Sequence, residues 1–527
     1  MKKILISDPV DRKCEEILKK AGYEVDYKTG LSTDELSEII QGYDALVVRS
    51  ETKVTPELIS NMENMEVIGR AGTGVDNINL DAATRKGIIV MNTPGGNTVS
   101  TAEHTMALML SMLRNIPQAN QSLRSGKWDR KSFKGTELYG KVIGVIGLGK
   151  VGREVVSRSK AFGMKVIGYD PVLSKEIADK MGIKLVDLDV IFAQSDIITV
   201  HVPLSNETKH LINSETLKKC KDGVRIINCA RGGIVDETAL IEALGSGKVS
   251  SAAFDVYEVE PPDLKSRLLN HSKVVCTPHL GASTEEAQIK VAVQIAEQIV
   301  NLFKNGRISG GVNASDIEAG SNKELNFYVK LAENLGCLQA QMIKGQLKQV
   351  NLSYSGELLY SSINLISTAV MKGFLSRVRT ESVNYINAPF FSKEMGIIIN
   401  ETKTVANINY KNLLEVEFIT EEEKHSLAGT VFGNNEIRLV NVDGFYLEFK
   451  PEGEMIFYSN VDRPGVLASV GKILAEANIN IAGLSLGRLG KGEKAITVIN
   501  IDSPINTDIL NSISDIDGIG NAFVVRA

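Results

Sequence analysis

Residues 142–152 read Val-Ile-Gly-Val-Ile-Gly-Leu-Gly-Lys-Val-Gly. The apolar run predicts a buried strand, and the G-x-G-x-x-G spacing after it predicts a tight turn into a helix. In this pattern Gly147 permits the turn, Gly149 lets a pyrophosphate approach the backbone, and Gly152 allows the helix to pack closely on the strand. The N–H groups at the start of such a helix attract phosphate. The segment therefore predicts a dinucleotide-binding βα unit.

The next predicted strand, Lys165–Tyr169, is followed directly by Asp170, at the spacing typical of this unit. A carboxylate at that place can accept hydrogen bonds from both hydroxyls of the adenosine ribose and repels a 2′-phosphate. We therefore expect NAD rather than NADP as the cofactor. The alternative is a structural glycine turn followed by an unrelated surface aspartate, and the surrounding strand–turn–helix–strand order favours the first interpretation.

On both sides of this unit, short β-branched runs alternate with helical patterns, which is typical of parallel sheets covered by helices on both faces. Long helices are expected at Thr101–Leu113 and Thr284–Lys304, and residues 306–322, rich in Gly, Ser and Asn, are expected to form a linker. The predicted strands are Lys3–Ser7, Ala45–Arg49, Val67–Gly69, Val142–Ile146, Lys165–Tyr169, Ile197–His201, Arg225–Asn228, Ala252–Val256 and Lys273–Thr277.

The last two hundred residues have a different order of predicted strands and helices. Strands are expected at Leu347–Ser353 and Glu415–Thr420, with a helix after Tyr360, and Pro451–Gly453 marks a further boundary. Residues 454–527 have the order strand, helix, strand, strand, helix, strand, which predicts a ferredoxin-like unit. A chain of 527 residues is also long enough for three to four domains at ~150 residues each.

Composition excludes several classes of protein. There are 59 Lys and Arg against 64 Asp and Glu, a net charge of −5, which does not suit a protein that coats nucleic acid or an anionic membrane. The five cysteines are scattered without a CxxC pair, so neither a disulfide framework nor a metal site is indicated. No apolar stretch approaches the ~18 residues of a membrane span, and the N-terminus lacks a signal-peptide core. A cytoplasmic protein is expected.

Three segments that follow predicted strands carry reactive side chains, and the carboxyl ends of parallel strands are where ligands bind. His279 is the candidate base for oxidising an alcohol, Glu260 can hold its imidazole, and Arg231 can hold the polarised oxygen and a carboxylate. Each has an alternative: His104 or His201 could be the base, Arg231 could form an ordinary ion pair, and Glu260 could merely precede a turn.

With these residues in place, the chain resembles the D-isomer-specific 2-hydroxyacid dehydrogenases. The resemblance rests on segments 147–152, 229–233, 258–261 and 278–284. It implies that Arg231, Glu260 and His279 are the catalytic trio. It also implies a set of NAD-binding residues: Gly147, Gly149, Lys150, Val151, Gly152, Asp170, Val202, Cys229, Ala230, Arg231, Asp255, His279, Gly281 and Ala282.

The resemblance also implies the architecture. A Rossmann-type nucleotide domain (99–286) is inserted in a flavodoxin-like substrate domain (1–98 with 287–310), and the helix at 101–113 carries the chain across. An α+β intervening domain (318–450), whose clearest match is Asn384–Pro389, and a ferredoxin-like ACT domain (454–527) follow. The active site is expected in the cleft between the first two domains.

The member of the family that the chain resembles over nearly its whole length implies the substrate. It implies oxidation of 3-phospho-D-glycerate to 3-phosphooxypyruvate, the first step of the phosphorylated route to L-serine. Arginine suits the anionic groups of such a substrate. The residues expected to bind it are Arg49, Arg70, Gly72, Thr73, Gly95 and Asn97, although one arginine, Arg49 in particular, could instead neutralise a neighbouring carboxylate.

The ACT resemblance implies binding of an amino acid between paired copies. It assigns a serine effector to Asn460, Asp462 and Asn480, and it implies a homo-oligomer, a dimer or tetramer. Two other functions stay open. One is a dehydrogenase for an unphosphorylated 2-hydroxyacid such as glycerate or lactate. The other is an NAD-sensing scaffold or corepressor on the same fold, against which the Asp462–Gly465 module weighs.

Overall fold

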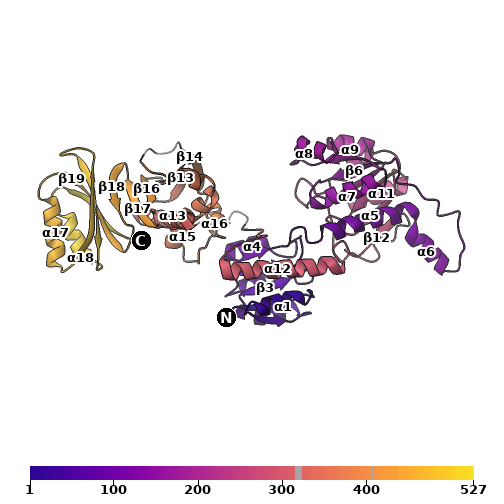
Figure 1. The fold of residues 1–527 in the computed structure, drawn as a ribbon, viewed down its shortest axis with the longest axis horizontal. Helices are drawn as coiled ribbons and strands as arrows, with labels where there is room; N and C mark the ends of the chain where they lie inside the picture. The colour runs from indigo at the N-terminus through magenta and orange to yellow at the C-terminus, as the bar shows by residue number, and fades with distance from the viewer. Residues whose placement is uncertain (315–322, 405–408, 434) are drawn as a thin grey trace.

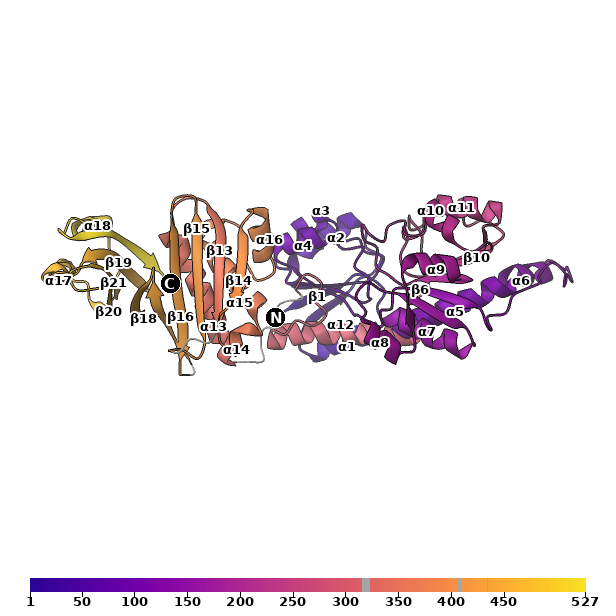
Figure 2. The same cartoon turned by 90° about the horizontal axis from the view of Figure 1, so that it is seen from above.

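The computed structural model describes residues 1–314, 323–404, 409–433 and 435–527. Four units lie in a row, with the nucleotide-binding pattern at one end and the C-terminal unit at the other (Figures 1 and 2). The N-terminus lies near the middle of the row. The second half of the expected linker, residues 315–322, lies outside the described residues, as does the start of the expected third domain.

The first unit is a parallel five-stranded sheet in the order β2-β1-β3-β4-β5, which is the flavodoxin-like order. Its strands are β1 (Lys3–Ile6), β2 (Glu24–Tyr27), β3 (Ala45–Val48), β4 (Val67–Arg70) and β5 (Ile89–Met91). Its helices are α1 (Lys13–Lys20), α2 (Thr33–Ile39), α3 (Pro56–Ser60) and α4 (Leu80–Lys86), with a short 3-10 helix at Ile40–Gly42.

The second unit is a parallel sheet in the order β12-β11-β10-β9-β6-β7-β8, in which the order reverses beside β6, as in a Rossmann-type domain. Its strands are β6 (Val142–Ile146), β7 (Lys165–Tyr169), β8 (Lys184–Leu185), β9 (Ile197–Val200), β10 (Val224–Asn228), β11 (Val249–Phe254) and β12 (Val274–Cys276). Its helices are α7 (Lys150–Ala161), α8 (Lys175–Lys180), α9 (Leu188–Gln194), α10 (Ser214–Lys219) and α11 (Glu237–Ser246).

Two long helices connect these units. The chain enters the second unit through α5 (Thr98–Arg114), which stops at Asn115 because that residue is left-handed, with φ 52°. It returns through α12 (Glu285–Asn305), whose apolar face packs in the core of the first unit. A Cβ on Gly69 would lie 2.8 Å from Cγ1 of Ile295, so glycine lets α12 lie close against β4. The two units therefore meet along α5 and α12.

The third unit is a six-stranded sheet in the order β14-β13-β15-β16-β17-β18, covered by helices. Its strands are β13 (Leu347–Ser355), β14 (Ile398–Lys403), β15 (Leu413–Thr420), β16 (Lys424–Phe432), β17 (Glu436–Val442) and β18 (Phe445–Phe449). Its helices are α13 (Lys323–Met342), α14 (Glu357–Tyr360), α15 (Ile363–Val378) and α16 (Ala388–Glu394).

The fourth unit has the expected β-α-β-β-α-β order and the sheet order β20-β21-β19-β22. Phe457 packs against Phe449 of β18 and stacks on Phe523, which joins the third and fourth units. Its elements are β19 (Glu454–Val461), α17 (Val466–Glu476), β20 (Ile481–Arg488), β21 (Lys494–Ile501), α18 (Thr507–Ser514) and β22 (Ile519–Arg526). The four-part α/β and α+β architecture expected from the sequence is thus confirmed.

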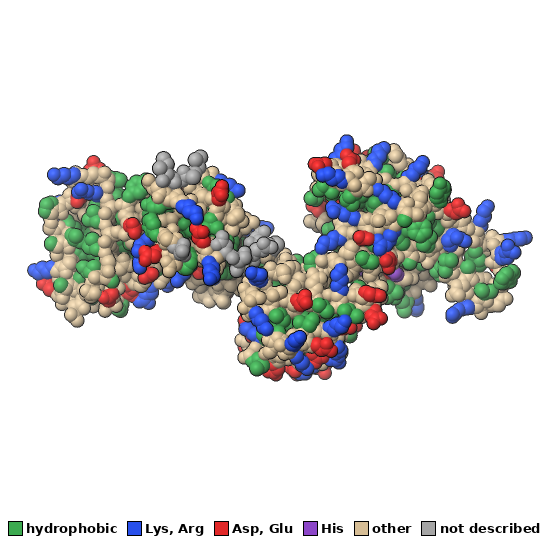
Figure 3. Space-filling view, in the orientation of Figure 1, with side chains coloured by type: hydrophobic (Ala, Val, Ile, Leu, Met, Phe, Trp, Pro, Cys, Tyr) green, Lys and Arg blue, Asp and Glu red, His purple; other side chains and the backbone are tan. Residues whose placement is uncertain are grey.

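The surface in Figure 3 mixes acidic and basic side chains, in keeping with the near-balanced charge. Within the described ranges, no helix combines the length and apolarity that a bilayer crossing requires. An arm consisting of α6 (Ile116–Arg124) and the loop after it extends away from the second unit (Figures 1 and 2).

Candidate functional site

The glycine turn between β6 and α7 has the geometry that a dinucleotide needs. Gly147 is left-handed, with φ 93°. A Cβ on Gly149 would meet nothing within 4 Å, so the backbone there is open to a ligand. A Cβ on Gly152 would lie 2.0 Å from the carbonyl oxygen of Gly147, so only glycine fits. Gly149 is the N-cap of α7 and has no side chain to bind the N–H groups at the start of that helix. These groups therefore suit a pyrophosphate.

Asp170 connects the end of β7 to this turn. Its Oδ2 accepts a hydrogen bond from the N–H of Leu148 at 2.8 Å, and its Oδ1 accepts from the N–H groups of Val172 and Leu173. Partial burial opposes ionisation of Asp170, but these backbone hydrogen bonds outweigh it and lower the pKa of the carboxyl. The negative charge expected to discriminate against a 2′-phosphate is therefore held in place beside the turn.

Two adjoining cavities, of about 640 and 420 Å³, lie between the first and second units. Their linings share Arg231 and His279. Residues predicted to bind the cofactor line the smaller cavity: Val151, Val202, Cys229, Ala230, Arg231, Asp255, His279, Gly281 and Ala282. Residues predicted for catalysis and substrate line the larger one: Arg49, Arg70, Gly72, Asn97, Arg231, Glu260 and His279. The structure therefore brings the trio to one cleft.

His279 and Glu260 form a hydrogen-bonded pair in this cleft. The distance from Nδ1 of His279 to Oε2 of Glu260 is 2.7 Å. Burial opposes ionisation of Glu260, but the bond from His279 outweighs it and lowers the pKa of the carboxyl. Because an ionised carboxylate only accepts, Nδ1 carries the hydrogen and Nε2 is left as the acceptor.

Asp255 holds the turn on which His279 lies. The carboxylate, 1% exposed, accepts from the N–H groups of Leu280 and Gly281 and from the side chain of Thr277. Burial opposes ionisation of Asp255, but these hydrogen bonds and one from His104 outweigh it and lower the pKa of the carboxyl. Asp255 thus positions the turn as well as lining the cofactor cavity.

The structure distinguishes among the three candidate bases. His104 lies between Asp255 and Thr277. His201 is hydrogen-bonded to Thr199, and burial lowers its pKa to about 4, which keeps it neutral. Of the three, His279 is the one paired with a carboxylate in the larger cavity.

Two hydrogen bonds hold the guanidinium group of Arg231. Its Nη1 donates to the carbonyl of Ala230, and its Nε donates to Asp76 in the first unit at 3.0 Å. Burial raises the pKa of the neighbouring Cys229 thiol to about 12, so this thiol stays neutral. The cleft thus presents an imidazole and guanidinium groups beside a neutral thiol.

Arg70 is the last residue of β4, and the other predicted substrate residues lie on loops that follow strands of the first unit. Burial, followed by the charge of Arg231, lowers the pKa of Arg70 to about 10, and a Cβ on Gly72 would lie 2.0 Å from its Nη1. Nη1 of Arg49 donates to the carbonyl of Pro9, whereas the backbone N–H of Arg49 donates to the Asp8 carboxylate at 2.6 Å. Thr73 donates to Asn97 at 2.8 Å. Gly95 lies outside both linings, but it faces Lys150 of the glycine turn across the cleft.

Sequence reasoning missed three charged residues that line the larger cavity, Glu51, Lys53 and Asp76. All three lie within a few residues of the predicted arginines, on the loops after β3 and β4. That nearness was the available signal, but none of these residue types in a loop is specific for a site.

The three predicted effector residues have separate partners. Asn460 is buried and accepts from Thr497, Asp462 pairs with Arg488 at 2.7 Å, and Asn480 donates to Asp502. Asp462 lies in the loop between β19 and α17, as expected. Among the described residues, no hydrogen bond or ion pair joins the three to one another.

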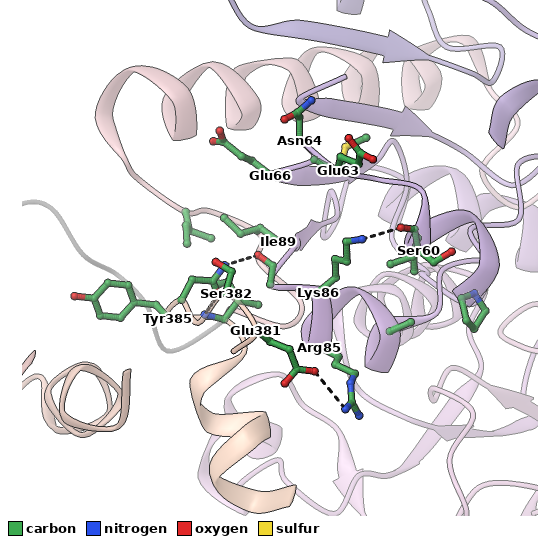
Figure 4. A pocket seen from close by; sticks show the side chains of 18 of the residues that line it. Ser60, Glu63, Asn64, Glu66, Arg85, Lys86, Ile89, Glu381, Ser382 and Tyr385 are labelled. Carbon is green, nitrogen blue, oxygen red and sulfur yellow. Dashed lines mark hydrogen bonds and ion pairs between the residues drawn. The ribbon is translucent and has the colours of Figure 1, made fainter. Parts of the chain in front are cut away.

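A third cavity, of about 910 Å³, lies between the first and third units (Figure 4). Beside it, Asn384 donates to the carbonyl of Gly87, and Arg85 pairs with Glu381 and, at 2.7 Å, with Glu394. A Cβ on Gly87 would lie 2.3 Å from Nδ2 of Asn384. The motif at 384–389 thus docks the third unit on the first, and none of the predicted site residues lines this cavity.

Known proteins match this chain both domain by domain and over its whole length. Residues 106–281 match the NAD binding domain of D-isomer specific 2-hydroxyacid dehydrogenases, residues 324–443 the D-3-phosphoglycerate dehydrogenase intervening domain, and residues 455–518 the ACT domain. The D-3-phosphoglycerate dehydrogenase of Archaeoglobus fulgidus is 44% identical over 99% of this chain and 100% of its own. The human enzyme of that name is 39% identical over 94% of each chain.

Solved structures match more than half of this chain. An NAD⁺-bound 3-phosphoglycerate dehydrogenase of Entamoeba histolytica is 32% identical, with a TM-score of 0.51, over 59% of this chain and 98% of its own. A glyoxylate reductase of Paecilomyes thermophila is also 32% identical, with a TM-score of 0.54, over 59% and 98%. With its glycine turn, paired histidine and four-part architecture, the chain belongs to the D-3-phosphoglycerate dehydrogenases, in the long form that carries an intervening and an ACT domain.

Proposed function

We infer that the chain oxidises 3-phospho-D-glycerate to 3-phosphooxypyruvate with NAD in the cleft between its first two units, the first step of the phosphorylated route to L-serine. The observation that carries this inference is the convergence of the His279–Glu260 pair with Arg231, Arg49 and Arg70 on one cavity. A base, an oxygen-binding cation and further cations for a second anionic group are the parts that this reaction requires.

The residues have separate tasks in the reaction. Nε2 of His279 takes the proton of the C2 hydroxyl, and Glu260, bonded to Nδ1, stabilises the imidazolium that results. Arg231 holds the carboxylate and the oxygen that becomes the carbonyl. NAD, when bound, accepts the hydride from C2. In the reverse direction His279 returns the proton to the oxygen.

The substrate residues suit a molecule with two anionic ends. We assign the phosphate to Arg49 and Arg70, and the carboxylate to Arg231 with the loops that carry Gly72, Thr73, Gly95 and Asn97. Arginine binds phosphate with paired, planar donors. In this proposal residues 1–98 with 287–310 bind the substrate, and residues 99–286 bind NAD at the residues named above. Closing the cleft would exclude water from the reacting atoms.

We propose that the two C-terminal units, 318–450 and 454–527, regulate and assemble the enzyme. The match to an ACT domain supports an amino-acid effector, and we propose L-serine, bound near Asn460, Asp462 and Asn480. The arm at α6 supports a homo-oligomer, since it exposes Trp128 (81%), Ile116 and Leu123, and apolar side chains on a projecting arm suit burial against a second copy.

A turnover assay tests these proposals. NADH absorbance is followed with NAD and, separately, 3-phosphoglycerate, glycerate or lactate, with and without L-serine. We expect turnover with 3-phosphoglycerate, reduced by serine. Turnover only with an unphosphorylated acid would contradict the phosphate assignment, and no turnover with any acid would favour an NAD-sensing scaffold. An unchanged rate with serine would contradict the effector proposal alone.

A further inference from the structure

An ion pair crosses the cleft between the two units that form it. Nε of Arg231 donates to Oδ2 of Asp76 at 3.0 Å. Arg231 follows β10 in the second unit, whereas Asp76 lies on the loop after β4 in the first. Both residues line both cavities of the cleft. The Arg231 side chain, 31% exposed, is therefore held by a residue on the opposite wall of the site.

The rest of the guanidinium group is also placed by its surroundings. Nη1 donates to the carbonyl of Ala230 at 2.7 Å. Nη2 lies against the backbone of Gly74, where an added Cβ would be only 2.0 Å from it. Because Nε, Nη1 and Nη2 all have a defined neighbour, the plane of the guanidinium is fixed, and Asp76 is the neighbour that carries a charge.

The charges of the cleft give Asp76 a second effect. Arg49, Arg70 and Arg231 all line the larger cavity. Burial lowers the pKa of Arg70, the charge of Arg231 lowers it further, and Asp76 acts in the opposite direction. Asp76 thus offsets the repulsion among cations that must stay close together to receive a doubly anionic substrate.

We propose that Asp76 is a positioning residue for hydride transfer, which acts by holding Nε of Arg231 across the cleft and so aims the Nη groups at the substrate. This inference rests on the proposed function of Arg231. A carboxylate on the substrate-side wall links the orientation of Arg231 to closure of the cleft, because the pair forms only when the two walls are this close. A misplacement of about 1 Å at such a site costs on the order of 100-fold in rate.

The test uses the full-length enzyme and a double-mutant cycle. Asp76→Ala should lower kcat/KM for 3-phosphoglycerate at least tenfold, while the NADH dissociation constant, measured by fluorescence, changes less than twofold. Asp76→Asn keeps an acceptor for Nε and should recover part of the loss. Asp81→Asn removes a neighbouring exposed charge outside the cleft lining and should leave both constants unchanged.

The second arm of the cycle separates positioning from a merely structural role. Arg231→Lys keeps a positive charge but has no guanidinium plane for Asp76 to orient, so Asp76→Ala should lower kcat/KM by a clearly smaller factor in that background than in the wild type. Wild-type kcat/KM in Asp76→Ala, or an equal loss in both backgrounds, would overturn this inference while leaving the proposed function intact. Wild-type kcat/KM in Arg231→Lys would instead overturn the proposed role of Arg231 and the inference with it.

Discussion

Gly232 is where the loop that carries Arg231 touches the loop that carries Glu260. A Cβ at this position would lie 1.7 Å from the carbonyl oxygen of Tyr257 and 2.9 Å from the amide nitrogen of Glu258. Both atoms belong to the backbone, so neither can rotate away. Carbon–oxygen contacts are normally no shorter than about 3.3 Å, so Gly232→Ala must push the two loops apart by about 1.6 Å.

That displacement separates Arg231 from the loop that carries Glu260. Because about 1 Å of misplacement costs on the order of 100-fold, we expect kcat/KM for 3-phosphoglycerate to fall at least ~100-fold. Overpacking of this kind also costs about 1–3 kcal/mol of stability. Steady-state turnover measures the first effect and the melting temperature measures the second. NADH titration shows whether the nucleotide site, whose glycine turn is on another loop, survives.

The matched control is the same substitution in the same unit. Gly245 lies in α11, where an added Cβ meets nothing within 4 Å. Gly245→Ala should raise the free energy of unfolding by about 0.5–1 kcal/mol and leave turnover unchanged. If Gly232→Ala showed wild-type kcat/KM and melting temperature, the loops would not be in the contact described, and the reasoning would fail.

Three other predictions follow from single side chains. His279→Ala should abolish most turnover and leave NADH binding intact, and unaltered turnover would end its assignment as the base. Asp170→Ala should weaken NAD binding and relax discrimination against NADP, and since three backbone hydrogen bonds are lost, the melting temperature should fall as well; an unaltered cofactor preference would contradict the ribose role. Asp443→Asn should destabilise the third unit most at acidic pH. The bond to Asp443, opposed by burial, raises the pKa of His425. Its stabilisation is therefore complete below pH ~6.5 and is lost as pH rises through the raised pKa. Melting curves of both proteins at pH 5.5 and 9 measure this, and a difference that grew with pH would refute it.

The elements that the sequence predicts well are the buried ones. Val142–Ile146 matches the observed strand to the residue, because a strand buried on both faces is a continuous apolar run. Lys165–Tyr169 also matches to the residue, although only Ile167 and Gly168 in it are buried. The edge strand β2 and the short helix α3 were missed, since a half-exposed strand of four residues and a helix of five carry little periodicity. The helix expected at Thr101–Leu113 begins three residues earlier, at Thr98.

The chain by itself determined what depends on neighbouring residues: the glycine turn, the order of strands and helices, and the residue types needed at the strand ends. Only the tertiary structure decided which residues meet across the cleft. Nothing local to residue 76 or 231 indicates that their side chains pair, nor that residue 232 must be glycine to clear a carbonyl 25 positions away. Local conformation follows from backbone geometry and periodicity, whereas contacts between distant segments are set by how whole sheets and helices pack.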